Sequence, residues 1–124
     1  ALAQEVNIAL ARVGLQDQSD RIAGDLAYGH QRLLEIAMGL GQAPQLLILD
    51  EPTQGLSDAE VDDFIALIKE VSATTTILLI EHNISVVMAL ADRITVMNFG
   101  QIIAEGSPQD IRQNEAVQTA YLGG

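Results

Sequence analysis

Hydrophobic residues in the first 40 positions recur at the spacing of an α-helix. One such stripe consists of Leu2, Val6, Ala9, Leu10 and Val13. Gly14 follows it, and glycine ends a helix in the left-handed conformation at little cost. After a polar stretch at 16–25, helical spacing returns at 28–40. This part of the chain therefore predicts two amphipathic helices joined by a loop.

Two short segments, residues 46–49 and 76–80, are hydrophobic at nearly every position. Runs of this kind are typical of parallel strands that are covered on both faces. Between them, Ser57 and Glu60 have the spacing of a capping box, which predicts a helix that continues to Val71. The order of strand, helix and strand predicts a layered α/β fold with a parallel sheet.

The last third of the chain predicts a short helix, a hairpin and a final helical region. Asn83 can cap a helix that runs to Ala91. Residues 93–98 and 101–105 have the pattern of two strands joined by a tight turn at 99–100. Ser107 followed by proline is typical of a helix start.

The charge balance excludes several classes of partner. The chain has 17 acidic residues against 6 Lys and Arg, a net charge of −11, and no cysteine. A field of this sign repels phosphate backbones and anionic lipids, so we expect no nucleic-acid partner. No stretch approaches the length of a membrane span, so we expect no direct membrane insertion.

Two adjacent acids, Asp50 and Glu51, follow the first hydrophobic strand. Open α/β sheets bind ligands at the carboxyl ends of their strands. Because successive strand residues point to opposite faces, one acid could hold a hydrated Mg²⁺ while the other polarises a water molecule. A strand followed by an acidic turn without function is the alternative.

Two further positions carry weaker signals. Gly29 precedes a helix, whose N-terminus offers unpaired N–H groups to a phosphate, although most such glycines only start a helix. His82 follows the second hydrophobic strand and could contact a phosphate or orient a water molecule. A lone histidine is more often a packed or exposed residue without function.

Three segments in a fixed order carry a family resemblance: LAYGHQR at 26–32, LLILDEPTQGLSDAE at 46–60 and TTILLIEHN at 75–83. They resemble the signature, the Walker B motif with its D-loop, and the H-loop of the ATP-binding-cassette (ABC) transporter ATPases. The segments VVMALADRITVMNFGQIIAEG, SPQDI and AYLGG that follow are similar to the ATPases of branched-chain amino acid importers. The resemblance covers the whole chain and implies the C-terminal half of such a subunit.

The resemblance implies a partial P-loop NTPase (RecA-like) core with a parallel sheet, joined to the end of the ABC helical subdomain. Residues 1–41 correspond to the helical subdomain with the signature motif. Residues 42–124 correspond to the C-terminal part of the nucleotide-binding core.

The resemblance also implies roles for single residues toward ATP and Mg²⁺. Asp50 corresponds to the acid that holds Mg²⁺, Glu51 to the catalytic base and His82 to the switch histidine near the γ-phosphate. Asp58 lies in the D-loop that couples two subunits. The signature, which contacts ATP bound by the opposite subunit, is formed by Ala27, Tyr28, Gly29 and His30.

The chain departs from the family pattern in its signature. Ala27 replaces the usual Ser, and His30 replaces the usual Gln. The alanine removes a hydroxyl whose hydrogen bond to a phosphate is worth about 1.5–3 kcal/mol. Leu33 and Met38 also stand where related ATPases commonly have Arg.

No G-x-x-x-x-G-K-[ST] motif occurs in the 124 residues, so the phosphate-binding loop is missing. By resemblance, the strand of that loop would lie between the strands at 76–80 and 93–98. Unpaired strand edges promote aggregation, so we expect marginal solubility for the chain alone. A monomeric sample that melts cooperatively at high concentration would contradict this expectation.

The resemblance implies an ATP-hydrolysing importer subunit, with the chain alone inactive. Its partners would be a second ABC ATPase subunit, arranged head to tail, and a transmembrane permease that residues 1–25 contact. Its location would be cytoplasmic, at the inner face of the cell membrane. A degenerate partner subunit without turnover is the first alternative. A receiver-type or flavodoxin-type domain is a more distant one.

Overall fold

The computed structural model describes residues 2–121, which form two compact units that divide between Glu81 and His82. The first unit contains α1 (Leu2–Arg12), η1 (Gln16–Gln18), η2 (Ala23–Asp25), α2 (Tyr28–Leu40), β1 (Leu46–Asp50), α3 (Asp58–Val71) and β2 (Thr76–Ile80). The second contains α4 (Ile84–Leu90), β3 (Ile94–Asn98), β4 (Gln101–Gly106), α5 (Pro108–Gln113) and α6 (Glu115–Tyr121). The expectation for the AYLGG segment falls partly on 122–124, which lie outside the described residues.

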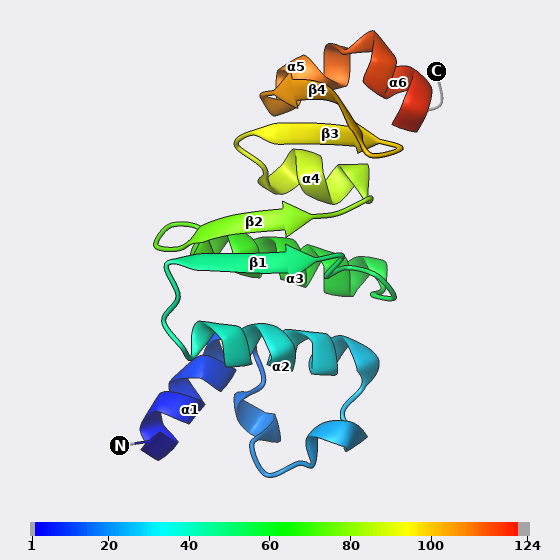
Figure 1. Cartoon of the computed structure of the whole chain (residues 1–124). Coiled ribbons are helices and arrows are strands. Elements are labelled where there is room, and N and C mark those ends of the chain that lie inside the picture. The colour runs from blue at the N-terminus through cyan, green and yellow to red at the C-terminus, as the bar shows by residue number, and fades with distance from the viewer. Residues whose placement is uncertain (1, 122–124) are drawn as a thin grey trace. The chain divides into compact units, whose positions relative to one another are not determined.

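The centre of the first unit is a parallel pair of strands, β1 and β2, with α3 along one face (Figure 1). The register pairs Leu47 with Ile77 and Leu49 with Leu79. The side of α3 that is buried consists of Phe64, Leu67, Ile68 and Val71. The predicted capping box is confirmed, because Ser57 and Glu60 each accept the other's backbone N–H.

The opposite face of the β1–β2 pair is exposed in the described part of the chain. It consists of Leu46, Ile48, Leu78 and Ile80, each between 48% and 58% exposed. The prediction that both faces of these strands are covered is therefore wrong for these residues. In the described residues the strands alternate between a packed and an exposed hydrophobic face, and Leu47 of the packed face also lies beside Gly39 of α2.

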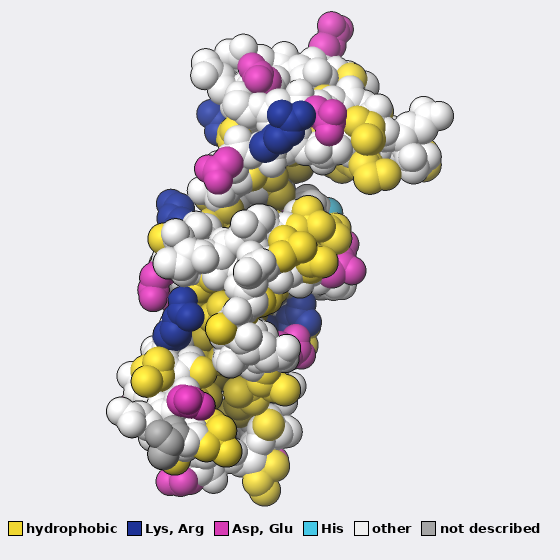
Figure 2. Space-filling view, turned by 60° about the vertical axis from the view of Figure 1, so that its left-hand side comes forward, with side chains coloured by type: hydrophobic (Ala, Val, Ile, Leu, Met, Phe, Trp, Pro, Cys, Tyr) yellow, Lys and Arg dark blue, Asp and Glu magenta, His cyan; other side chains and the backbone are white. Residues whose placement is uncertain are grey.

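The two predicted N-terminal helices are α1 and α2. Gly14, at φ 75°, ends the first in the left-handed region, as the sequence predicts. None of the α1 side chains is buried. The helix lies beside α2, and side chains of both helices line a shallow groove of about 220 Å³. The groove is lined by hydrophobic side chains that include Leu2, Val6 and Met38. Figure 2 shows exposed hydrophobic side chains near the N-terminal end of the molecule.

The second unit contains the predicted hairpin, with β3 and β4 antiparallel. Phe99 and Gly100 form its turn at φ 49° and 78°. Its core is formed by Ile94, Ile111 and Val117. The final helical region is two helices, because the Asn114 side chain accepts the N–H of Val117 and starts α6.

Candidate functional site

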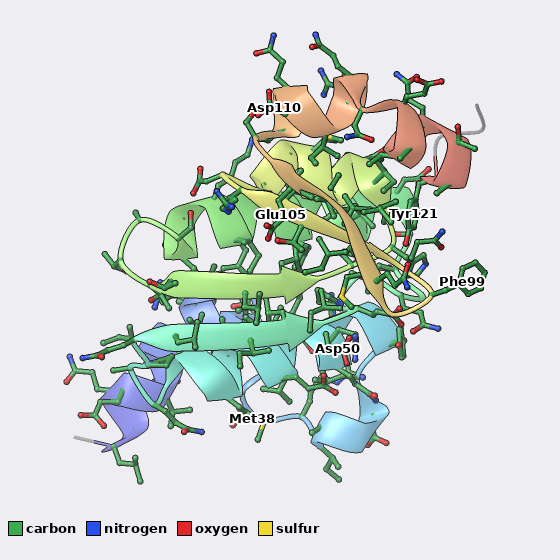
Figure 3. All side chains as sticks on the ribbon, turned by 45° about the horizontal axis from the view of Figure 1, so that its top comes forward. Met38, Asp50, Phe99, Glu105, Asp110 and Tyr121 are labelled. Carbon is green, nitrogen blue, oxygen red and sulfur yellow. The ribbon has the colours of Figure 1, made fainter. Side chains whose placement is uncertain are left out.

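The two candidate acids lie at the carboxyl end of β1, where Figure 3 shows Asp50. Asp50 is the last strand residue and is exposed to solvent. Glu51 is outside the strand, half-buried, and has φ 48°, in the left-handed region. The alternation of side chains along a strand therefore ends at Asp50 and does not apply to Glu51. The left-handed backbone of Glu51 sets the direction of its side chain instead.

The loop after Glu51 is fixed to the end of β2. Thr53 is only 6% exposed, and its hydroxyl donates to the Glu81 carboxylate at 2.7 Å. Its backbone N–H points to the same oxygen at 3.3 Å. Sequence reasoning missed both residues. Their positions directly after strands that end side by side are the signal that could have found them.

The predicted signature residues lie at the start of α2. Ala27 is the N-cap and provides no side-chain hydrogen bond to the helix. The first N–H groups of a helix have no partner within the helix, so this end favours an anion. Ala27, Tyr28, Gly29 and His30 therefore lie at a helix start, and their contact with a phosphate stays a prediction.

Gly29 lies directly against the side chain of Glu60, at the start of α3. A Cβ atom added at Gly29 would lie 1.3 Å from Glu60 Oε2 and 2.4 Å from Cδ. Only a glycine fits here while that carboxylate keeps its place. Asp58 is the first residue of α3, so the D-loop candidate and the signature candidate belong to two helix starts that meet.

The Glu60 carboxylate is also the most clearly perturbed acid of this region. Its pKa is lowered because it accepts the backbone N–H and interacts with the side chain of Ser57, with a smaller contribution from the charge of His30. The carboxylate is therefore held ionised at the junction of the two helix starts.

Two further side chains of α2 contact the loop that follows β1. The Arg32 guanidinium donates to the carbonyl oxygen of Glu51 at 2.9 Å. The Tyr28 hydroxyl donates to the carbonyl of Gln54 at 3.2 Å, and its ring lies beside Gly55. Sequence reasoning assigned Arg32 no role, although it is one of only three cationic side chains before Pro44.

His82 follows β2 and begins the second unit, where it is exposed. Its proximity to Glu51 stays a prediction. Among residues 2–121, no group of three or more His, Asp or Glu side chains comes together to hold a metal ion. Mg²⁺ commonly binds through one or two carboxylates with waters and phosphate oxygens, and the exposed carboxylate of Asp50 fits that mode.

Comparisons with known proteins concern the family of the chain. The family model described as ABC transporter matches residues 1–54, and the one described as branched-chain amino acid ATP-binding cassette transporter matches residues 101–124. The high-affinity branched-chain amino acid transport ATP-binding protein BraF of Pseudomonas aeruginosa is 47% identical over 116 residues, which are 92% of this chain and 46% of BraF.

Solved structures give the same result at the level of the fold. The ADP conformation of MJ1267, an ATP-binding cassette of an ABC transporter, matches with a TM-score of 0.85 and 30% identity over 98% of this chain and 50% of that one. The cbiO1 protein of Clostridium perfringens, part of the ABC transporter complex cbiONQ, matches with a TM-score of 0.81 and 31% identity over 97% and 49%. The chain spans about half the length of the relatives it matches.

Proposed function

Because the chain belongs to the ABC transporter ATPase family, we propose that it is part of an ATP-binding and ATP-hydrolysing importer subunit for branched-chain amino acids. The observation that carries the proposal is the meeting of two features in one unit. A helix start with an open N-terminus, at Ala27 to His30, adjoins a loop that begins with Asp50 and Glu51 at the carboxyl end of a parallel strand. The acids would serve a nucleotide bound by their own subunit, and the helix start would serve a nucleotide bound by the opposite subunit.

The acids divide the chemistry between them. Asp50 would hold Mg²⁺, which would supply positive charge that offsets the charge of the phosphates. Glu51 orients the attacking water and accepts its proton. His82 would contact the γ-phosphate or orient a water molecule. These groups position the reactants and neutralise charge, which is most of what phosphoryl transfer requires.

The helix start at Ala27 serves a nucleotide held by a second copy or a related subunit. Gly29 allows close approach of the backbone, and Tyr28 offers its N–H at the first helical position. His30 replaces an amide with a ring that also donates a hydrogen bond. Asp58, at the adjacent helix start, lies where the two subunits would be coupled.

The phosphate-binding loop would belong to the half of the relatives that this chain does not match. The exposed face of Leu46, Ile48, Leu78 and Ile80 indicates that a further element covers this side of the sheet, because a parallel sheet needs cover on both faces. The chain alone would therefore not turn over ATP.

The permease contact would lie within residues 1–25. The groove between α1 and α2 is lined by hydrophobic side chains from both helices, including Val6 and Met38. No helix among the described residues is long and apolar enough to cross a membrane. The subunit would act in the cytoplasm, at the inner face of the membrane, through its permease.

The test uses this chain joined to the half of BraF that it does not match, hereafter the reassembled protein. We expect ATP turnover that falls at least a hundredfold in Glu51→Gln, because an amide cannot accept the proton of the attacking water. The matched control is Glu70→Gln, an exposed acid on α3, which should keep native turnover. Turnover that is unchanged in Glu51→Gln would refute the role of Glu51.

A degenerate partner subunit is the second candidate, and Ala27 favours it. Its side chain forms no cap bond and provides no hydroxyl for a phosphate. A reassembled protein that folds and binds ATP without turnover would support this candidate. Ala27→Ser with His30→Gln would then restore turnover if the signature is the cause.

A further inference from the structure

The backbone of Glu51 adopts a conformation that its own sequence disfavours. Its φ of 48° lies in the left-handed region, which residues with a Cβ atom rarely enter. Pro52 follows, and a proline restricts the preceding residue further, toward extended conformations. Such a conformation persists only where the surrounding structure holds it, and it concentrates at functional sites.

Contacts with other elements hold the backbone of Glu51. Its N–H donates to the carbonyl of Ile80 at 2.7 Å, which fixes it to β2. Its carbonyl accepts Nη2 of Arg32 at 2.9 Å and lies 3.3 Å from the N–H of Gln54. Arg32 brings a full positive charge to this carbonyl. Hydrogen bonds with an ionised donor are shorter and stronger than neutral ones.

Arg32 is itself held in place. Its side chain is 24% exposed, and Nη1 lies 3.3 Å from the carboxylate of Glu35, one turn further along α2. Its guanidinium also lies 6.0 Å from the centre of the Tyr28 ring, whose hydroxyl donates to Gln54. Two side chains of one helix therefore contact the loop at its first and fourth residues.

We infer that Arg32 is a positioning residue for the catalytic base, holding the Glu51 backbone in the conformation that directs its carboxylate at the attacking water. This inference rests on the proposed function. It means that the helix whose start meets ATP on the opposite subunit also sets the base of its own subunit. A shift of α2 would move Arg32 and change the geometry of Glu51.

The test measures ATP turnover and ATP affinity of the reassembled protein with Arg32→Gln and Arg32→Lys. We expect kcat to fall roughly ten- to hundredfold in Arg32→Gln, the range for losing one hydrogen bond to a charged group. KM and ATP affinity should stay within about twofold, because Arg32 acts on the base and not on bound nucleotide. Arg32→Lys keeps the charge and should recover part of kcat.

A double substitution separates positioning from a general effect on the fold. If Arg32 acts through Glu51, then Arg32→Gln should have almost no further effect on the residual turnover of Glu51→Gln. The control is Arg93→Gln, which removes an exposed charge paired with Glu105 at 3.9 Å and should leave kcat unchanged.

The outcomes distinguish the inference from the proposed function. Absence of Glu51-dependent turnover in the native reassembled protein contradicts the proposed function. With that turnover present, an unchanged kcat in Arg32→Gln, or a loss that multiplies with that of Glu51→Gln, overturns the inference. Failure of both Arg32 variants to fold also overturns it, because the arginine would then be needed for the fold and not for positioning.

Discussion

The contact between Gly29 and Glu60 predicts how Gly29→Ala changes the free energy of unfolding with and without the Glu60 side chain. In Gly29→Ala, the added methyl group would lie 1.3 Å from Oε2 of Glu60, so the carboxylate must move. The three nearest atoms all belong to that carboxylate, which is the far end of a flexible side chain. The displacement breaks the hydrogen bond at 3.0 Å from Ser57 N–H to Glu60 Oε1. The capping box of α3 is then lost.

The substitution also has a favourable effect. Alanine is more favourable than glycine inside a helix by up to about 1 kcal/mol. In the native protein, this gain is offset by the displaced carboxylate, so we expect little net change in the free energy of unfolding. In a Glu60→Ala background the obstacle is gone. Gly29→Ala should then stabilise the protein by up to about 1 kcal/mol.

Urea unfolding of the reassembled protein, followed by circular dichroism, measures this difference. With a urea dependence of about 1–3 kcal/mol per molar, a 1 kcal/mol change moves the midpoint by roughly 0.3–1 M. Gly24→Ala is the control, since its added Cβ atom would meet nothing within 4 Å. Equal effects of Gly29→Ala in both backgrounds would refute the contact with Glu60.

Two further predictions follow from the same unit. The pKa of Glu60 lies below its ordinary value of 4.5, chiefly because of its hydrogen bonds with Ser57. Its contribution to stability is therefore full above about pH 4.5 and is lost as the pH falls through the lowered value in the folded protein. Glu60→Gln should flatten the pH dependence of unfolding in that window, and an unchanged profile would contradict the assignment. Thr53→Val removes the hydroxyl that donates to Glu81 at 2.7 Å, and it should destabilise by about 1.5–3 kcal/mol in thermal unfolding. Thr53→Ser keeps the donor and should lose much less; equal losses in the two variants would show that the hydroxyl is not the cause.

Local patterns in the sequence predicted the elements because each depends on neighbouring residues. The capping box at Ser57, the helix start at Ser107, the left-handed Gly14 and the hairpin turn at 99–100 are all confirmed. The break between α5 and α6 was missed, since Asn114 is a capping residue without a glycine or proline to mark it.

The candidate acids could be predicted, but the contacts that hold them could not. Asp50 and Glu51 were found because they follow a hydrophobic strand. Arg32 is 19 residues from Glu51 and Thr53 is 28 residues from Glu81, and no local pattern connects such pairs. The left-handed backbone of Glu51 even opposes its local preference, because a proline follows. Tertiary contacts decide this part of the site.

The exposed face of β1 and β2 links the stability of the first unit to the geometry of its site. Fully burying a side chain such as Leu or Ile contributes about 1.5–3 kcal/mol. Leu46, Ile48, Leu78 and Ile80 are each about half exposed, so covering them would add roughly 3–6 kcal/mol in total. That gain is comparable with the net stability of a whole domain, about 5–15 kcal/mol. Glu51 follows β1 directly and is hydrogen-bonded to the end of β2. An element that covers this face therefore also stabilises the position of the proposed base. The competence of the site therefore depends on the part of the protein that packs against these four side chains, and turnover has to be measured with that part present.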